Sequence, residues 1–178
     1  MREVSGAELS RATAEASRGE FEDFYVSEYA GVLGLAYALS GSRWAAEDLA
    51  QEAFLAAHRS WDRIARYDRP GAWVRRVVAN LAVSAFRRRV AEAKALARAA
   101  LQRTQSVPEL SPDDADFWRV VRSLPRRQAQ VVALYYLEDR TIAHIAEILD
   151  MAQGTVKKHL HDGRRTLARR LQLQEDET

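Results

Sequence analysis

Apolar residues recur at helical intervals through the first part of the chain. From Phe21 onward, aromatic and aliphatic positions lie three or four residues apart, which predicts a helix to about Tyr37. Residues 40–43 interrupt this period and supply Ser42 as the N-terminal cap of a second helix, over about 44–61. The pattern therefore predicts two consecutive helices joined by a short turn.

A third helix is expected after the turn that Pro70 and Gly71 mark. It begins near Ala72, reaches Arg89 and continues into the alanine-rich stretch beyond. One side of this helix is apolar, which predicts a buried stripe with two supporting valines. The stripe consists of Trp73, Val77, Leu81 and Ala85, and the supporting residues are Val74 and Val78.

Prolines and polar side chains separate this block from a second one. The sequence "QRTQSVPELSPDD" contains two prolines and too few apolar positions to stabilise a packed segment, which predicts a flexible linker over 91–112. A linker of about 22 residues spans at most roughly 70–80 Å. The second block opens near Asp113 with a short helix, and Pro125 starts the next helix, where its missing N–H costs nothing.

The sequence "TIAHIAEILDMAQGTVKKHL", residues 141–160, has the pattern of a helix-turn-helix. Ala146 is small at the point where the two helices would cross closely. Asp150 holds the turn position that glycine usually takes, and Ala152 stands where a capping serine is common. An ordinary amphipathic hairpin with a charged outer side is the alternative interpretation. The expected core positions are Ile145, Leu149, Met151, Val156, Leu160, Leu167 and Leu171.

Polar and basic side chains of the second helix of this motif remain free to face a DNA duplex. In a helix-turn-helix, the N-terminal residues of that helix approach base edges in the major groove. Lysine and arginine suit phosphates, whereas glutamine, threonine and lysine also suit base edges. We call this set the duplex-reading face: Gln153, Thr155, Lys157, Lys158, His161 and Arg165.

Composition narrows the class of protein. The 178 residues include 8 glycines and 4 prolines, with much Ala, Leu and Arg and no alternating Val, Ile and Thr, which predicts an all-α fold. The absence of cysteine excludes disulfides and thiol-ligated zinc. No apolar run approaches the roughly 18 residues of a membrane span, and the N-terminus lacks the apolar core of a signal peptide. We expect a soluble cytoplasmic protein without membrane insertion.

Charge is distributed unevenly, although the totals of 27 basic and 25 acidic residues nearly balance. Residues 153–170 carry six basic side chains and one acidic side chain, and residues 73–89 carry five basic and none acidic. Residues 44–56 carry three acidic side chains and no Lys or Arg. This separation predicts two kinds of partner, one polyanionic and one that accepts an acidic surface.

No arrangement of residues typical of catalysis or metal binding stands out. His159 and His161 lie on different faces of one expected helix, and His58 and His144 are far away in sequence. The sequence therefore predicts that the protein is not an enzyme and that it uses no cofactor and no metal.

Two stretches, in order, resemble regions of bacterial RNA polymerase sigma factors. "AAEDLAQEAFLAAHRSW" followed by "PGAWVRRVVANLAVSAFRRR" is similar to region 2, and "LPRRQAQVVALYYLEDRTIAHIAEILDMAQGTVKKHLHDGRRTLARRL" is similar to region 4. With only these two regions and a short linker, the chain resembles the extracytoplasmic-function (ECF) group of the sigma-70 family.

The resemblance implies two small helical domains, region 2 and region 4 with its helix-turn-helix, joined by a flexible linker. The polar N-terminal extension fits either a frayed helix or a disordered segment. The expected boundaries are an extension over 1–19, region 2 over 20–90, the linker over 91–112, region 4 over 113–173 and a tail over 174–178.

For the second helix, the resemblance implies docking on the basic clamp helices of the polymerase largest subunit. The residues concerned lie three or four positions apart and share one side of the helix. A solvated surface, with its acidic side chains favoured by the helix dipole, is the alternative. We call this set the polymerase-docking face: Asp48, Gln51, Glu52 and Leu55.

For the third helix and the loop before it, the resemblance implies binding of the non-template strand of the −10 element and capture of an everted base. Such binding needs cations along the backbone and an amide that bonds a base edge. Asn80 matches the asparagine of the family pattern in "VAN". The loop is shorter than in some relatives, so the resemblance does not imply which base is captured. We call this set the strand-capture face: Tyr67, Asp68, Arg69, Arg76, Asn80, Ser84 and Arg87.

The function implied is that of an alternative sigma factor, a monomer when free. It would bind core RNA polymerase, read the −35 element with the duplex-reading face, and promote melting of the −10 element. An anti-sigma partner is common in the group, and nothing in the sequence demonstrates one. The alternatives are a sigma-like adaptor that sequesters an anti-sigma factor and a stand-alone helix-turn-helix regulator. The first would lack the basic residues found here, and the second leaves the acidic helix unexplained.

Overall fold

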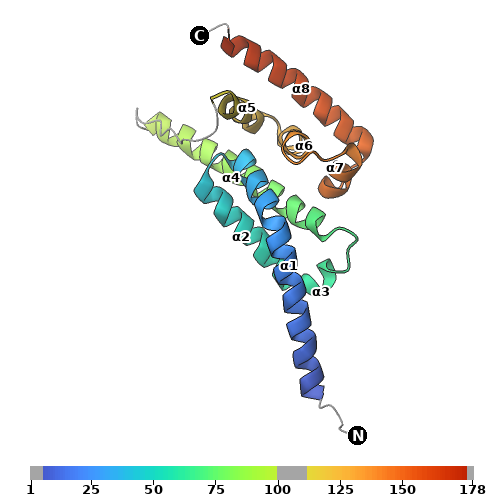
Figure 1. The fold of residues 1–178 in the computed structure, drawn as a ribbon. Helices are drawn as coiled ribbons and strands as arrows, with labels where there is room; N and C mark the ends of the chain where they lie inside the picture. Colours follow the sequence, from blue (N-terminus) through green and yellow to red (C-terminus); the bar gives the residue numbers. More distant parts are fainter. Residues whose placement is uncertain (1–5, 100–111, 176–178) are drawn as a thin grey trace.

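Residues 6–99 and 112–175, which the computed structural model describes, form helices and turns without any strand (Figure 1). The all-α prediction is confirmed. Residues 100–111 of the expected linker, and 1–5 and 176–178 at the ends, lie outside the described part. The helices are α1 (Gly6–Ser40), α2 (Arg43–Arg59), α3 (Trp61–Ile64), α4 (Pro70–Ala99), α5 (Pro112–Ser123), α6 (Arg126–Tyr136), α7 (Ile142–Leu149) and α8 (Gln153–Glu175).

Helices α1, α2 and α4 pack together as a first bundle, with the short α3 against α1 and α2. Aromatic rings from α1 meet Phe54 of α2 and Trp61 of α3, for example Tyr25 at 4.7 Å and Phe24 at 4.8 Å between ring centroids. The expected break between the first two helices is confirmed: the Ser42 side chain accepts a hydrogen bond from the Ala45 amide at 3.4 Å.

The buried side of α4 differs from the stripe predicted from the sequence. Val74, Val78 and Ala82 are fully buried, whereas the predicted stripe is only partly buried. The reason is that α4 contacts α1 and α2 as well as α6 and α7. A helix that is covered from two directions buries a wide part of its circumference. The apolar stripe seen in the sequence then does not mark the most buried side. The stripe residues that this corrects are Trp73, Val77, Leu81 and Ala85.

Helices α5 to α8 form the second bundle, which contains the predicted helix-turn-helix. Asp150 ends α7 in the left-handed conformation, with φ 54° and ψ 60°, as the sequence predicted for a position that usually holds glycine. Five of the seven expected core positions are buried, and Met151 and Leu171 are partly buried against them. The buried five are Ile145, Leu149, Val156, Leu160 and Leu167.

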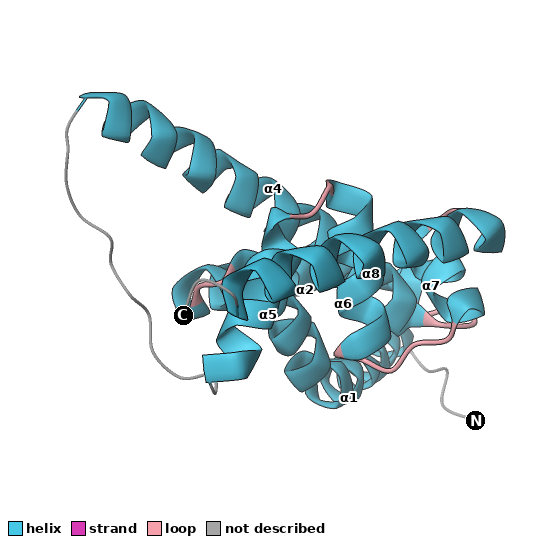
Figure 2. Ribbon diagram, turned by 90° about the horizontal axis from the view of Figure 1, so that it is seen from above, coloured by secondary structure: helices cyan, strands magenta, loops and turns pink. Residues whose placement is uncertain are grey.

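The two bundles lie against each other instead of standing apart. Helix α1 contacts α5 and α6, and α4 contacts α6 and α7. In Figure 1, α5 and α6 lie between α8 and the first bundle, so that α8 is outermost. Figure 2 shows the end of α4 projecting past the packed helices, as expected for a third helix that continues beyond Arg89.

Gly163 of α8 lies where α8 crosses α6 closely. A Cβ added at Gly163 would meet Cγ2 of the fully buried Val132 at 2.9 Å, whereas one at Gly154 would meet nothing within 4 Å. We expect Gly163→Ala to lower the free energy of unfolding by about 1–2 kcal/mol, because overpacking outweighs the gain in helix propensity. Gly154→Ala, the matched control, should raise it by about 0.5 kcal/mol. Thermal unfolding followed by circular dichroism measures both, and equal effects would contradict close packing at Gly163.

Candidate nucleic-acid and partner interfaces

Helix α8 presents the duplex-reading face to solvent. Its six predicted residues are all exposed, while Val156, Leu160 and Leu167 on the opposite side are buried. Ala152 precedes α8 and has no polar side chain with which to cap it, while its carbonyl accepts hydrogen bonds from the amides of Thr155 and Val156. The helix-turn-helix core therefore holds a row of free basic and polar side chains on its outer side.

Arg164 extends the cationic surface of α8, a role that the sequence analysis missed. Its guanidinium carbon lies 4.8 Å from the Tyr135 ring centroid, and its Nε donates to the Tyr136 hydroxyl at 2.8 Å. This hydrogen bond raises the pKa of Arg164 above its ordinary value. The aromatic pair fixes one arginine beside Arg165. The two tyrosines lie on α6, so no pattern within the sequence of α8 indicates this contact.

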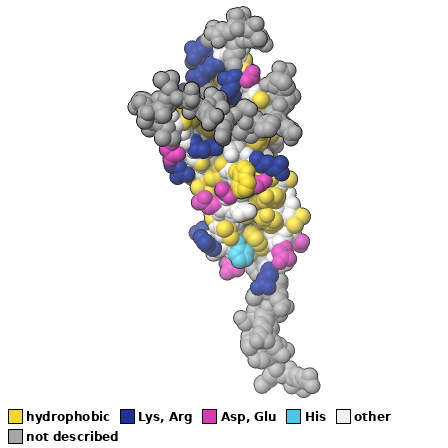
Figure 3. Space-filling model, turned by 90° about the vertical axis from the view of Figure 1, so that its left-hand side faces the viewer, with side chains coloured by type: hydrophobic (Ala, Val, Ile, Leu, Met, Phe, Trp, Pro, Cys, Tyr) yellow, Lys and Arg dark blue, Asp and Glu magenta, His cyan; other side chains and the backbone are white. Residues whose placement is uncertain are grey.

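The polymerase-docking face is exposed along α2. Leu55 keeps 56% of its surface accessible, and Asp48, Gln51 and Glu52 are exposed beside it. Gln51 and Leu55 also line a groove of about 420 Å³ between α1 and α2. Figure 3, seen from the side of α2, shows hydrophobic side chains gathered on this face with acidic ones next to them. The other residues that line this groove were not predicted from the sequence as part of the site: Phe21, Tyr25, Phe54 and His58.

The strand-capture face is divided between free and engaged residues. Tyr67 and Asp68 in the loop, and Ser84 and Arg87 further along α4, are exposed. A polar groove of about 700 Å³ runs beside the loop, and Trp73 contributes one wall. Arginines surround the groove, two of which the sequence analysis did not single out. These are Arg63 and Arg66, beside the predicted Arg69 and Arg76.

Arg69 and Arg76 reach from the first bundle to the C-terminal end of α7. The Arg69 guanidinium pairs with Glu147 at 2.9 Å. Arg76 donates to the backbone carbonyls of Ile148 and Glu147 at 2.7 and 2.8 Å, and lies 3.6 Å from Asp150. Carbonyls in the last turn of a helix lack intrahelical partners and carry partial negative charge, so a guanidinium satisfies them well.

Asn80 is also engaged by the second bundle. Its Oδ1 accepts hydrogen bonds from Arg126 at 2.6 Å and from Gln130 at 2.9 Å, both on α6. The buried Gln130 additionally donates to the carbonyl of Ala79 at 3.1 Å. The amide oxygen with which this side chain would accept from a base edge is thus occupied.

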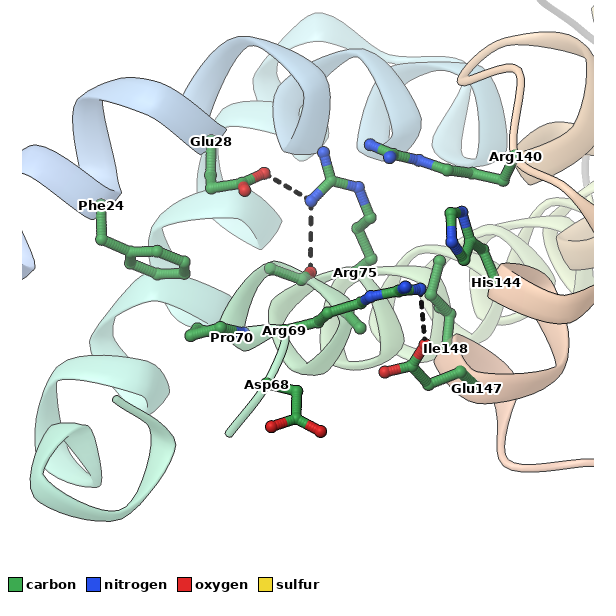
Figure 4. A pocket seen from close by; sticks show the side chains of 12 residues that line it. Phe24, Glu28, Asp68, Arg69, Pro70, Arg75, Arg140, His144, Glu147 and Ile148 are labelled. Carbon is green, nitrogen blue, oxygen red and sulfur yellow. Dashed lines mark hydrogen bonds and ion pairs between the residues drawn. The ribbon is translucent and has the colours of Figure 1, made fainter. Parts of the chain in front are cut away.

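Arg75, next to Arg76, is buried between carboxylates from both bundles. Its side chain is 7% exposed, and it pairs with Glu28 of α1 at 2.5 Å (Figure 4). It also pairs with Glu138 of the α6–α7 loop, whose side chain is 5% exposed. Burial alone would lower the pKa of Arg75, but the two carboxylates outweigh it and raise the pKa above the ordinary value. In the sequence, Arg75 belongs to a basic stretch, and no local pattern indicates its partners 47 and 63 residues away.

Family models match both halves of the chain in the expected order. The model described as Sigma-70 region 2 matches residues 24–92, and the model described as Sigma-70, region 4 matches residues 114–167. The chain is therefore a two-region protein of the sigma-70 family.

Curated relatives identify the group within that family. The chain is 31% identical to the ECF RNA polymerase sigma factor SigM of Mycobacterium tuberculosis over 95% of this chain and 86% of the relative. It is 28% identical to SigW of Bacillus subtilis, also described as an ECF RNA polymerase sigma factor, over 77% and 81%. The chain belongs to the ECF group, whose members are transcription initiation factors and not enzymes.

Two solved structures share the fold. The sigma factor RpoE in complex with the anti-sigma factor NepR from Bartonella quintana superposes with a TM-score of 0.68 at 21% identity, covering 86% of this chain and 97% of that one. CnrH in complex with the cytosolic domain of CnrY gives 0.65 at 20% identity, covering 90% and 94%. Both likenesses extend over the two bundles.

Neither a membrane-spanning helix nor a cluster of metal ligands occurs in the described part of the chain. Each of its helices is too short or too polar to cross a bilayer. His, Asp and Glu side chains do not gather there in groups of three or more that would hold a metal ion.

A serine at position 152 should stabilise the start of α8. Ala152→Ser places a hydroxyl at the N-terminal cap position of α8, where it can accept a hydrogen bond from an amide of the first turn, and such a cap stabilises helices by about 1 kcal/mol. The melting temperature should rise by roughly 4–8 °C if the second bundle unfolds as a unit of 60–100 residues. Ala168→Ser, an exposed position inside α8, is the control and should lower stability slightly. A rise at both positions would show that capping is not the cause.

Proposed function

We propose that this chain is an alternative sigma factor that binds core RNA polymerase, reads the −35 element with α8, and melts the −10 element with α4 and its preceding loop. The observation that carries the proposal is the exposed duplex-reading face, held on a buried apolar stripe in a chain with regions 2 and 4 in order. We take region 2 as residues 20–90 and region 4 as residues 113–173, with the linker and terminal segments bounded as the sequence predicts.

We assign polymerase binding to the polymerase-docking face and its groove. An exposed leucine flanked by acidic and amide side chains suits a basic helical partner, because apolar contact supplies affinity and complementary charge supplies orientation. The apolar groove beside Gln51 and Leu55 supports this assignment. In this proposal, the polymerase catalyses RNA synthesis, and the chain itself contributes no catalytic residue.

We assign single-strand binding to the strand-capture face. Arginines around a polar groove attract the phosphate backbone, Tyr67 offers a partly exposed ring for stacking, and the Asn80 amide can bond a base edge. Melting then follows from binding energy, since each base held outside the stack compensates a few kcal/mol of lost pairing and stacking. Promoter DNA and core polymerase are the proposed partners. An anti-sigma factor is a proposed third partner, by analogy with the two solved complexes.

Two variants should separate polymerase binding from promoter melting. Gln51→Ala combined with Glu52→Ala should weaken binding to core polymerase about tenfold, because it truncates the centre of the docking face. Asn80→Ala should bind core polymerase normally and initiate less at a cognate promoter. Core binding is measured by fluorescence titration, and initiation by run-off transcription from a genomic library.

Asp62→Ala, an exposed acidic position outside α2, serves as the control for the loss of negative charge. Equal transcription by both variants, or more initiation with Asn80→Ala, would contradict the assigned roles.

Substitutions on α8 should separate base reading from phosphate contact. Lys158→Ala should weaken duplex binding to all sequences alike and lower the salt slope by about 1, whereas Gln153→Ala should relax discrimination at one base pair by about 1–3 kcal/mol. Holoenzyme binding to promoter duplexes that differ at single positions, measured over several salt concentrations, distinguishes the two. An identical profile for the two variants would remove the assignment of separate roles.

A further inference from the structure

We propose that Trp44, which lies outside the predicted polymerase-docking face, is the main apolar anchor of the surface through which α2 binds a basic helix of core RNA polymerase. The predicted face begins one turn later, at Asp48. This role of Trp44 rests on the proposed function, because the partner is the polymerase to which that function assigns the docking face. Trp44 adds the residue that supplies most of the apolar contact, and with it a longer interface.

Trp44 is exposed to an extent that its neighbours in the fold do not share. It lies in the first turn of α2 with 81% of its surface accessible, the highest value among the large hydrophobic residues whose exposure the structure describes. By contrast, Trp61 and Trp118 are buried, and Trp73 is partly buried. A tryptophan removes about 150–250 Å² of surface from water when it is buried. Single apolar side chains are common on protein surfaces, so the residues around Trp44 decide what its exposure means.

Exposed side chains follow one straight row along α2, and Trp44 begins this row. Successive members lie four, three, four and three residues apart, which is the spacing that keeps side chains on one seam when two helices lie along each other. At about 1.5 Å per residue, the row is about 21 Å long. The opposite side of α2 is buried, with Ala46, Ala53 and Ala57. We call the exposed set the docking row: Trp44, Asp48, Gln51, Leu55 and His58.

The docking row has two apolar side chains with acidic and amide side chains between them. Trp44 and Leu55 are eleven positions apart in the chain. Asp48 and Gln51 lie between them, with Glu52 alongside. Apolar contact supplies affinity, whereas the carboxylates select a basic partner and fix its register. Figure 3 shows hydrophobic and acidic side chains next to one another on this side of the molecule. A basic amphipathic helix therefore fits the docking row.

Trp44 contributes the larger of the two apolar contacts. Tryptophan is enriched among the residues that dominate binding energy, whereas leucine is under-represented among them. Leu55 lines the groove between α1 and α2, and Trp44 lies beyond the residues that form this groove. Without Trp44, the apolar surface of the row would be confined to its C-terminal part, and a partner helix would be held at one point only.

The first turn of α2 holds Trp44 in place before a partner binds. The Ser42 side chain accepts a hydrogen bond from the Ala45 amide at 3.4 Å. Arg43, next to Trp44, pairs with Glu47 at 3.2 Å, and the nearby carboxylate reduces the repulsion between Arg43 and a basic partner. A side chain on an ordered turn loses less conformational freedom on binding, which favours affinity.

Truncation of Trp44 tests this role in the full chain. Trp44→Ala should weaken binding to core polymerase about tenfold or more, and more than Leu55→Ala does, because the larger apolar contact is lost. Trp44→Phe, which keeps an aromatic ring, should retain most of the affinity. Trp44 has little buried surface and alanine is the better helix former, so helix content measured by circular dichroism should be unchanged.

The matched control is Val26→Ala on α1. It also removes an exposed apolar side chain, and Val26 does not line the groove beside the docking row. Its affinity for core polymerase should equal that of the unchanged chain. Each chain carries a dye at Arg169→Cys, an exposed position on α8, which is labelled selectively because the sequence contains no cysteine. Fluorescence titration with purified core polymerase measures the affinities.

Iodide quenching measures directly whether Trp44 becomes covered. Chains that contain 5-hydroxytryptophan in place of tryptophan are excited at wavelengths that the tryptophans of the polymerase do not absorb. In the free chain most of the quenching should come from Trp44, because Trp61 and Trp118 are buried. Saturating core polymerase should lower the quenching several-fold in the otherwise unchanged chain and change it little in Trp44→Phe. Quenching of Trp44 that persists in the complex would overturn its role.

Failure of this role is distinguishable from failure of the proposed function. If Trp44→Ala binds core polymerase normally while Gln51→Ala combined with Glu52→Ala does not, Trp44 is not an anchor and the proposed function stands. If the unchanged chain does not bind core polymerase at all, both are refuted. Sedimentation of the free chain tests a second copy as the occupant of the row. Self-association that Trp44→Ala abolishes, with unchanged affinity for core polymerase, would also overturn the role of Trp44.

Discussion

The arrangement of the two bundles depends on one buried charge. A guanidinium keeps its proton at any physiological pH, so the 7% exposed side chain of Arg75 requires carboxylates close by. Glu28 comes from its own bundle and Glu138 from the other. Glu138 also pairs with Arg140 of its own bundle at 2.9 Å, so this chain of charges joins the interiors of the two bundles. Exposed ion pairs such as Arg69 with Glu147 contribute little by comparison.

The chemistry that suits DNA also suits the end of a helix. Phosphate oxygens and the last carbonyls of a helix are both acceptors with negative charge or partial charge, and a guanidinium bonds either one. In the free chain, the last carbonyls of α7 therefore take the place of the DNA phosphates that we propose Arg76 binds during initiation. Such a contact satisfies the guanidinium in the free chain and is replaceable, because a phosphate offers the same kind of acceptor.

Most of the fold followed from local sequence patterns. The helical period, the Ser42 cap and the left-handed Asp150 were all predictable, because each depends on residues within one or two turns. The exposed duplex-reading face was predictable for the same reason, since Val156 and Leu160 fix which side of α8 is buried. On α4, the supporting residues Val74 and Val78 are buried as predicted, whereas the predicted stripe is only partly buried. Helix α4 is covered by α1 and α2 as well as by α6 and α7, and no periodicity within α4 reports contacts from both bundles.

By itself the sequence determined the helices, their order, the helix-turn-helix and the placement of acidic and basic surfaces on separate helices, because periodicity, capping and charge act between near neighbours in the chain. Only the tertiary structure decided which of the basic and amide side chains are free. Arg75, Arg76 and Asn80 look equally available in the sequence, yet their partners lie 46 to 72 residues away. Whether residues so far apart in the chain pair depends on how the two helical bundles pack. That packing is decided by the burial of apolar side chains together with the pairing of buried charges.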